Sequence, residues 1–285
     1  MDFSCAKYIS LLEALEGAGY SFQTFEEFMN NRSEKTVILR HDVDRRPANA
    51  MRFAQIEASM DIRASYHFRA DEARKDPDML VKTGELGHEV AYHYEDLSRI
   101  SRKGRLNESI LKNAWTAFRS NLAFLRQYYP VRVASMHGDP ASLTDNRSLW
   151  QAFSYNGEGI VCEPYYDIDY SSVLYLTDTG RKWDNKKVNV RDRVTPGIGL
   201  TSGKPLSDCF TFKGTDDIIR AVKGGTLPHA VIINTHPQRW NDNIFEWITE
   251  MIMQKVKNPV KYVIVSYRRY LQGRLPLFKF FCLLY

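Results

Sequence analysis

The sequence predicts an α/β protein with a mostly parallel β-sheet and covering helices. Short apolar runs rich in β-branched residues alternate along the chain with segments of helical periodicity, an order typical of parallel βαβ units. Several of these runs stop at clusters of ionisable residues, as parallel strands do at the carboxyl edge where α/β proteins carry their sites. We expect one domain over residues 1–285, with a helical lead-in at 1–35 and an irregular insertion region at 141–228.

Composition and charge predict a globular protein without a membrane span. Of the 285 residues, 44% are hydrophobic, which is enough to form a substantial core. The net charge is +5, but basic and acidic residues are interspersed, so the charge pattern does not indicate nucleic-acid binding. Four widely spaced cysteines without a Cys-x-x-Cys pair, and no recognisable leader, predict a cytoplasmic protein with reduced thiols. No run approaches the roughly 18 apolar residues of a membrane span. The tail at 277–285, LFKFFCLLY, either packs on the domain or makes a peripheral membrane or partner contact.

The first predicted strand ends in two aspartates. Two short helices at 6–29 precede the buried run at 36–39, which is followed at once by Arg40, His41, Asp42 and Asp44. Two carboxylates in Asp-x-Asp spacing repel each other, so a cation such as a divalent metal, or a shared proton, would hold them together. The alternative is a capping loop, with Asp44 as the N-cap of a helix that begins near Pro47.

The next units repeat this order. A helix at 47–60, a strand at 63–70, a short helix at 76–83 and a strand at 89–94 follow. Residues i and i+2 of a strand share a face, so His93 and Glu95 point together. Because a parallel sheet brings successive strand ends side by side, we expect His93 close to the aspartate pair, although a lone strand histidine can also be a core residue.

Three further strands end in polar residues. An amphipathic helix at 105–128 precedes a strand at 131–136, which ends at His137. A strand at 173–177 leads to Arg181 and Trp183, which form either an exposed pair able to contact a sugar or nucleotide-sugar, or a surface turn. A strand at 231–234 leads to His236, and a helix at 243–257 with a short strand at 262–266 closes the domain.

Residues 37–97 resemble the polysaccharide deacetylase superfamily, carbohydrate esterase family 4. The matching stretches are His-Asp-Val-Asp at 41–44, Ile-Arg-Ala-Ser-Tyr-His-Phe at 62–68 and Gly-His-Glu-Val-Ala-Tyr-His at 87–93. The spaced Asp-Val-Asp is similar to a branch of the family associated with O-antigen and other surface polysaccharide biosynthesis. The resemblance implies an irregular (β/α) barrel, with Asp42 as the catalytic base and Asp44 and His93 as ligands of a divalent metal, zinc being expected.

The same resemblance extends more weakly to two other strand ends. His236, in Thr-His-Pro, resembles the family's final histidine element and would be the general acid that protonates the leaving nitrogen. Leu97 stands where the family has a second metal histidine, and His137 stands where it has an arginine. An open zinc-like site needs a third protein ligand. His137 is the preferred candidate and Glu95 is the alternative.

The expected activity is therefore metal-dependent hydrolysis of an N-acetyl or similar amide group on a carbohydrate precursor. In a cytoplasmic protein that precursor would be a nucleotide sugar or a lipid-linked saccharide. Two other hypotheses stay open. Aspartate and histidine clusters at strand ends also serve phosphoesterases and amidohydrolases, and the substitution at Leu97 is compatible with a non-catalytic saccharide-binding relative.

Overall fold

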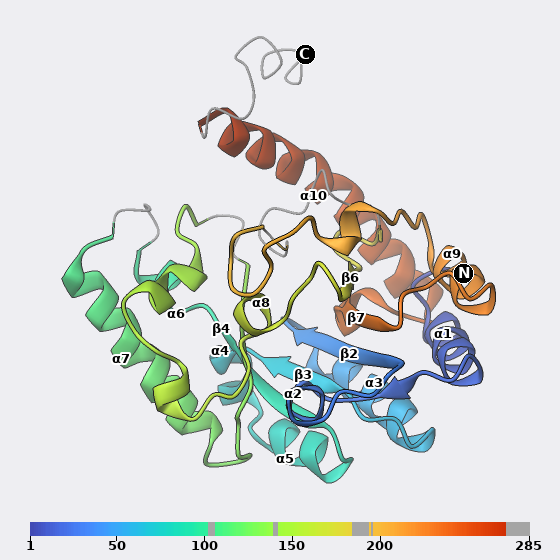
Figure 1. Ribbon diagram of the computed structural model, residues 1–285, viewed down its shortest axis with the longest axis horizontal. Coiled ribbons are helices and arrows are strands. Elements are labelled where there is room, and N and C mark those ends of the chain that lie inside the picture. The colour runs from blue at the N-terminus through green and yellow to red at the C-terminus, as the bar shows by residue number, and fades with distance from the viewer. Residues whose placement is uncertain (102–105, 139–141, 184–193, 195, 272–285) are drawn as a thin grey trace.

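A curled sheet of parallel strands forms the centre of the protein, with helices outside it (Figure 1). The computed structural model describes residues 1–101, 106–138, 142–183, 194 and 196–271. In these residues the strands are β1 (Ser21–Phe22), β2 (Thr36–Val43), β3 (Ser65–Phe68), β4 (Glu89–Tyr94), β5 (Ala134–Met136), β6 (Leu174–Thr177) and β7 (Ala230–Thr235). Their order is β5-β4-β3-β2-β7-β6, with β1 beside the start of β2. The predicted α/β class with mostly parallel strands and outer helices is confirmed.

Helices connect most of these strands. The α-helices are α1 (Cys5–Gly17), α2 (Phe25–Asn30), α3 (Pro47–Ser59), α4 (Ala70–Lys75), α5 (Asp78–Glu85), α6 (Asp96–Ile100), α7 (Glu108–Leu125), α8 (Pro164–Asp167), α9 (Thr215–Lys223) and α10 (Ile244–Leu271). Local sequence explains several starts. The Thr24 side chain caps α2 in a capping box with Glu27, the Asn107 side chain accepts from the third backbone N–H of α7, and Pro47 opens α3.

Alternating strand residues supply two separate hydrophobic clusters. Val37 and Leu39 of β2 belong to the larger cluster, which includes side chains of α1, α3, α5, α7 and α9. Ile38 points to the opposite face and packs with Ala91 of β4 and Ile232 of β7 in a smaller cluster. Since successive strand residues face opposite sides, the even-numbered residues of β2 continue along the face of Ile38. This face carries the polar side chains of Arg40 and Asp42 near the end of the strand.

The C-terminal part of the chain differs from its prediction. Residues 262–266 were expected to form a strand, but they belong to α10, which runs on through Pro259. Val263, which lies inside the predicted strand, is exposed and stands at helical spacing from the exposed Val260 and Tyr267 on either side of it, so the apolar pattern of this stretch is that of a helix side. None of the helices in the described ranges is long and apolar enough to span a bilayer. The tail at 277–285 lies outside the described residues.

Candidate active site

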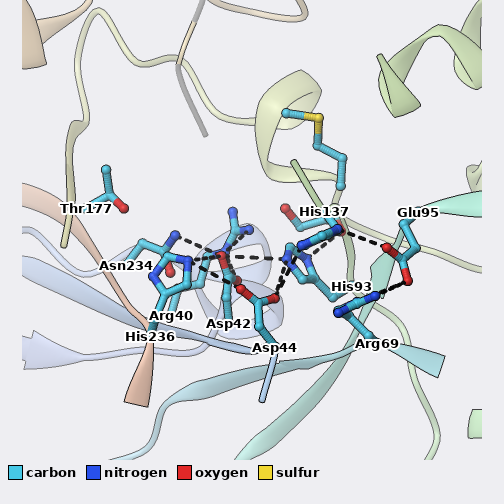
Figure 2. A network of polar contacts seen from close by, with 12 residues as sticks. Arg40, Asp42, Asp44, Arg69, His93, Glu95, His137, Thr177, Asn234 and His236 are labelled. Atoms are coloured by element: carbon cyan, nitrogen blue, oxygen red, sulfur yellow. Dashed lines mark hydrogen bonds and ion pairs between the residues drawn. The ribbon is translucent and has the colours of Figure 1, made fainter. Parts of the chain in front are cut away.

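The carboxyl ends of four strands bring five of the predicted residues together (Figure 2). Asp42 lies near the end of β2 and Asp44 just beyond it, while His93 comes from β4. His137 follows β5 directly, and His236 follows β7 directly. The parallel register sets these ends side by side, because His93 pairs with Ser135 of β5, and His41 pairs with Thr235 of β7.

Asp44, His93 and His137 form a cluster with metal-ligand spacing. One ligand atom of each lies within 4.8 Å of the others. Asp44 Oδ1 is 3.8 Å from His93 Nε2 and 3.6 Å from His137 Nε2, and this buried oxygen has no hydrogen-bond partner among the described residues. Two imidazoles and a carboxylate are the donor set of open zinc sites. The residues present therefore fit a divalent metal.

The surroundings of His93 leave its Nε2 available as a ligand atom. Its Nδ1 lies 3.0 Å from the carbonyl oxygen of Ser135, and since a carbonyl only accepts, Nδ1 carries the proton and the lone pair of Nε2 faces Asp44. Burial lowers the pKa of His93 to about 4, so the ring is neutral at physiological pH. A neutral imidazole is the form that binds a metal.

Glu95 lies behind His137 and contacts it on the side away from Asp44 (Figure 2). Its Oε2 is 3.0 Å from His137 Nδ1, and its Oε1 accepts two hydrogen bonds from Arg69, at 3.0 and 2.7 Å. Although burial opposes ionisation, His137 and then Arg69 lower the pKa of Glu95 to about 2. This arrangement suits a residue that orients a ligand histidine. Arg69 had no place in the sequence-based site.

Asp42 is held by two neighbours that sequence analysis did not assign to it. Arg40, two residues earlier on β2 and only 1% exposed, donates to both carboxylate oxygens at 2.8 and 3.1 Å. Asn234 of β7 donates to Oδ2 at 3.0 Å. Burial alone would raise the pKa of Asp42, but Arg40, then His93 and His236, hold it well below its usual value. Asp42 is therefore ionised at neutral pH.

A second group of possible ligand atoms overlaps this region. Asp42, His67 and His93 also approach within 4.8 Å of one another, and neither ring nitrogen of His67 has a hydrogen-bond partner in the described part of the chain. However, Arg40 already engages both oxygens of Asp42, and its positive charge disfavours a cation there. The group formed by Asp44, His93 and His137 is the better metal site.

His236 is oriented by a buried carboxylate. Its Nδ1 lies 2.7 Å from Asp178 Oδ1, while its Nε2 lies 3.9 Å from Asp42 Oδ2 and 3.8 Å from Asp44 Oδ2. Asp178 is fully buried and also accepts from Arg239 and from the indole of Trp240. Burial would raise its pKa, yet Arg239 and His236 lower it. Asp178 follows the strand at 174–177, and that position was the only signal in the sequence.

Arg181 and Trp183 are not the exposed pair that was considered for sugar contact. Arg181 is 9% exposed, donates to the carbonyl oxygen of Trp247 at 2.8 Å and lies over the Phe3 and Trp247 rings. Trp183 is 6% exposed, and its indole donates to Thr215. Arg181 is covered by α10 and by Phe3, while Trp183 lies against Phe3, Trp240 and Thr215 of α9. Both side chains therefore contribute to packing and do not belong to the strand-end cluster.

Comparisons with known proteins find only distant similarity, and only among solved structures. The sequence matches no protein-family model and no curated protein sequence. Among solved structures it is similar to a carbohydrate esterase family 4 pseudoenzyme from Bacillus anthracis, with TM-score 0.40, 11% identity, and coverage of 80% of this chain and 63% of that one. The chain thus spans less than two thirds of that neighbour.

Two further neighbours are described as enzymes. A family 4 carbohydrate esterase from Bacillus anthracis has TM-score 0.38 and 11% identity, with 86% of this chain and 85% of that chain covered. The peptidoglycan deacetylase PdaC from Bacillus subtilis has TM-score 0.36 and 13% identity, with 80% and 96% covered. Since every identity is below 25% and every TM-score below 0.5, these neighbours do not assign a function to this chain.

Proposed function

We propose that this protein is a metal-dependent hydrolase that removes an N-acetyl or similar amide group from a carbohydrate. The observation that carries the proposal is the placement of an ionised, buried Asp42 between two different groups. On one side lies the cluster of Asp44, His93 and His137, and on the other lies His236 with its partner Asp178. A base, a metal site and an acid at one point are what amide hydrolysis requires.

Each residue has a role that follows from its contacts. Asp44, His93 and His137 would hold a divalent ion, zinc in our proposal, with Glu95 and Arg69 orienting His137. When bound, such an ion supplies polarisation of the acetyl carbonyl and a lowered pKa of the attacking water.

Asp42, which Arg40 keeps ionised, accepts the proton of the attacking water. His236 stands across from it, with Nε2 free to face the substrate because Asp178 engages Nδ1. We assign His236 as the general acid that donates a proton to the departing nitrogen. Asp178 would stabilise the protonated ring and fix its orientation.

We further propose that the substrate is a precursor of a surface polysaccharide such as an O-antigen, presented as a nucleotide sugar or lipid-linked saccharide in the cytoplasm. This part extends the sequence resemblance of residues 37–97. An acetate-release assay against N-acetylated sugars, free and attached to a nucleotide or to a polyprenyl phosphate, would distinguish these classes. Release from phosphate esters alone would favour a phosphoesterase.

Metal content gives the first test. Untagged wild-type protein, His93→Ala and His137→Ala are purified without chelator, incubated with zinc, desalted and measured by plasma mass spectrometry, with the exposed His229→Ala as the matched control. We expect one ion per chain in the wild type and control, and little in the other two. Wild-type protein without metal would contradict the hydrolase and favour a saccharide-binding protein. Loss in His93→Ala alone would return the third-ligand role to Glu95.

Asp42→Asn separates catalysis from metal binding. Since Asp42 is paired with Arg40, we expect this variant to keep its metal and to lose acetate release by about 10²-fold or more. Full activity in metal-loaded Asp42→Asn would contradict the assignment of the base.

A further inference from the structure

Helix α10 turns its apolar side to solvent and part of its polar side to the protein. Exposed apolar residues recur along one side at intervals of three or four: Phe245 (77% exposed), Ile248 (38%), Ile252 (53%), Val256 (66%), Val260 (58%), Val263 (36%) and Tyr267 (46%). Glu250 and Gln254, by contrast, are 6% and 7% exposed. A helix that only packed on a domain would bury its apolar side and expose its polar side. We call the seven exposed residues the outer stripe.

Specific contacts determine which side of the helix faces outward. The Trp247 indole donates to the carbonyl oxygen of Asp2 at 2.7 Å, and Arg181 donates to the Trp247 carbonyl at 2.8 Å. About three turns further on, Asn258 donates to the carbonyl oxygen of Gly180 at 3.2 Å. Figure 1 shows that the later turns extend away from the sheet. The outer stripe is therefore presented outward by contacts on the opposite side.

The start of helix α10 carries Glu246 and Glu250, but beyond Glu250 every charged residue of the chain is basic. Residues 251–285 contain seven Lys and Arg and no Asp or Glu, a charge of +7. Because the whole chain carries +5, residues 1–250 carry +5 minus +7, or −2. The basic character of the protein thus belongs entirely to its last 35 residues, which also contain the sequence FKFF at 278–281. Exposed apolar residues next to basic ones are the pattern of helices that lie in a membrane interface.

We propose that the outer stripe of α10 binds the surface of a membrane that contains anionic lipids, with the helix lying in the plane of the interface. The apolar side chains enter the acyl boundary, and the basic residues, Lys255 and Lys257 among them, contact the anionic headgroups. A second copy of the chain is a poorer occupant, because two segments of charge +7 repel each other. The inference is independent of the chemistry proposed for the strand ends.

Vesicle flotation tests this surface with the full chain. Vesicles of phosphatidylcholine are compared with vesicles that contain about one third phosphatidylglycerol, at low and high salt. We expect binding to the anionic vesicles that weakens as salt is added. Substituting Ile252→Ser together with Val256→Ser should lower the partition coefficient by about tenfold or more. Lys255→Gln together with Lys257→Gln should lower it by roughly tenfold on anionic vesicles alone.

The matched control is Leu143→Ser with Leu200→Ser, since these residues are 55% and 61% exposed and lie outside α10. It should bind as the wild type does. Circular dichroism melting confirms that each variant is folded. The proposal is wrong if the wild type does not bind anionic vesicles, or if the variant that combines Ile252→Ser and Val256→Ser binds them as strongly as the wild type does. A dimer in sedimentation velocity that this variant abolishes would assign the outer stripe to a second copy instead.

Discussion

At the scale of single residues, the site depends on charges that are buried and individually compensated. Arg40 and Asp42 lie two positions apart on one strand, so their side chains share a face of the sheet. Their hydrogen bonds are therefore local contacts within one strand. His236 instead needs Asp178, which lies 58 residues earlier in the chain. In both cases a buried charge is stabilised by a fixed partner, and removing that partner should be costly.

Arg40→Leu tests this compensation. Among the described residues it leaves Asn234 as the remaining hydrogen-bond donor to the buried carboxylate of Asp42, so we expect a loss of about 3–5 kcal/mol in unfolding free energy. It also removes the main influence that lowers the pKa of Asp42, so the acid limb of the pH–rate profile should move to higher pH. Urea unfolding and acetate-release rates measure the two effects.

An exposed ion pair provides the comparison for that variant. Arg132, which pairs with Glu26 at 2.8 Å, is half-exposed, and Arg132→Leu should cost less than about 1 kcal/mol. Equal losses of unfolding free energy in Arg40→Leu and Arg132→Leu would show that burial does not increase the contribution of the Arg40–Asp42 pair to stability.

At the scale of elements, strand β2 organises both of its faces. Its even-numbered residues carry the site, while His41 points to the other side and lies 2.7 Å from Glu57 of α3 and 2.7 Å from Thr235 of β7. Glu57 is fully buried and also accepts hydrogen bonds from Tyr8 at 2.5 Å and Tyr66 at 2.6 Å. This network ties α1, α3, β3 and β7 to the strand that bears the two aspartates.

Glu57→Gln should destabilise the protein in a pH-dependent way. Burial opposes ionisation of Glu57, but His41 leads the contacts that lower its pKa below the usual value. A lowered folded-state pKa adds stability above the unfolded pKa, near pH 4.5, and this stability is lost as the pH falls through the folded value. We therefore expect Glu57→Gln to cost about 2–4 kcal/mol at pH 7 and less in acid.

Denaturant unfolding from pH 7 downward measures the difference between wild type and variant. Glu13 lies on the exposed side of α1, so Glu13→Gln should leave the unfolding free energy nearly unchanged at every pH. A penalty for Glu57→Gln that stays constant or grows toward acid would contradict an ionised Glu57.

At the scale of the whole molecule, metal binding would be linked to the free energy of unfolding. The proposed ligands Asp44, His93 and His137 lie in or directly after three different strands, so a metal that joins them would stabilise only the folded chain. At a free zinc concentration of about 100 times Kd, the expected gain in unfolding free energy is about 2.7 kcal/mol. Thermal unfolding with graded free zinc should show a rising Tm in wild type and a nearly flat response in His93→Ala.

The sequence by itself determined the alternation of strands and helices from residue 36 to residue 235, and the strand ends where polar residues occur, but not the two-residue strand β1 or the helical state of 262–266. Apolar runs with β-branched residues are local patterns, and in a parallel sheet their carboxyl ends necessarily meet at one edge. That reasoning brought Asp42, Asp44, His93, His137 and His236 to one place, as the structure does. Arg40 was equally local, but its pairing with Asp42 was not recognised.

Only the tertiary structure decided which side chains face one another across that edge. The partner of His236, the position of Glu95 behind His137, and the burial of Arg181 and Trp183 depend on segments far apart in the chain. The same is true of α10, whose amphipathic pattern is visible in the sequence while its outward apolar side is not. Local periodicity defines a face of an element, but long-range packing decides what that face meets, and this is where the chemistry of the site is determined.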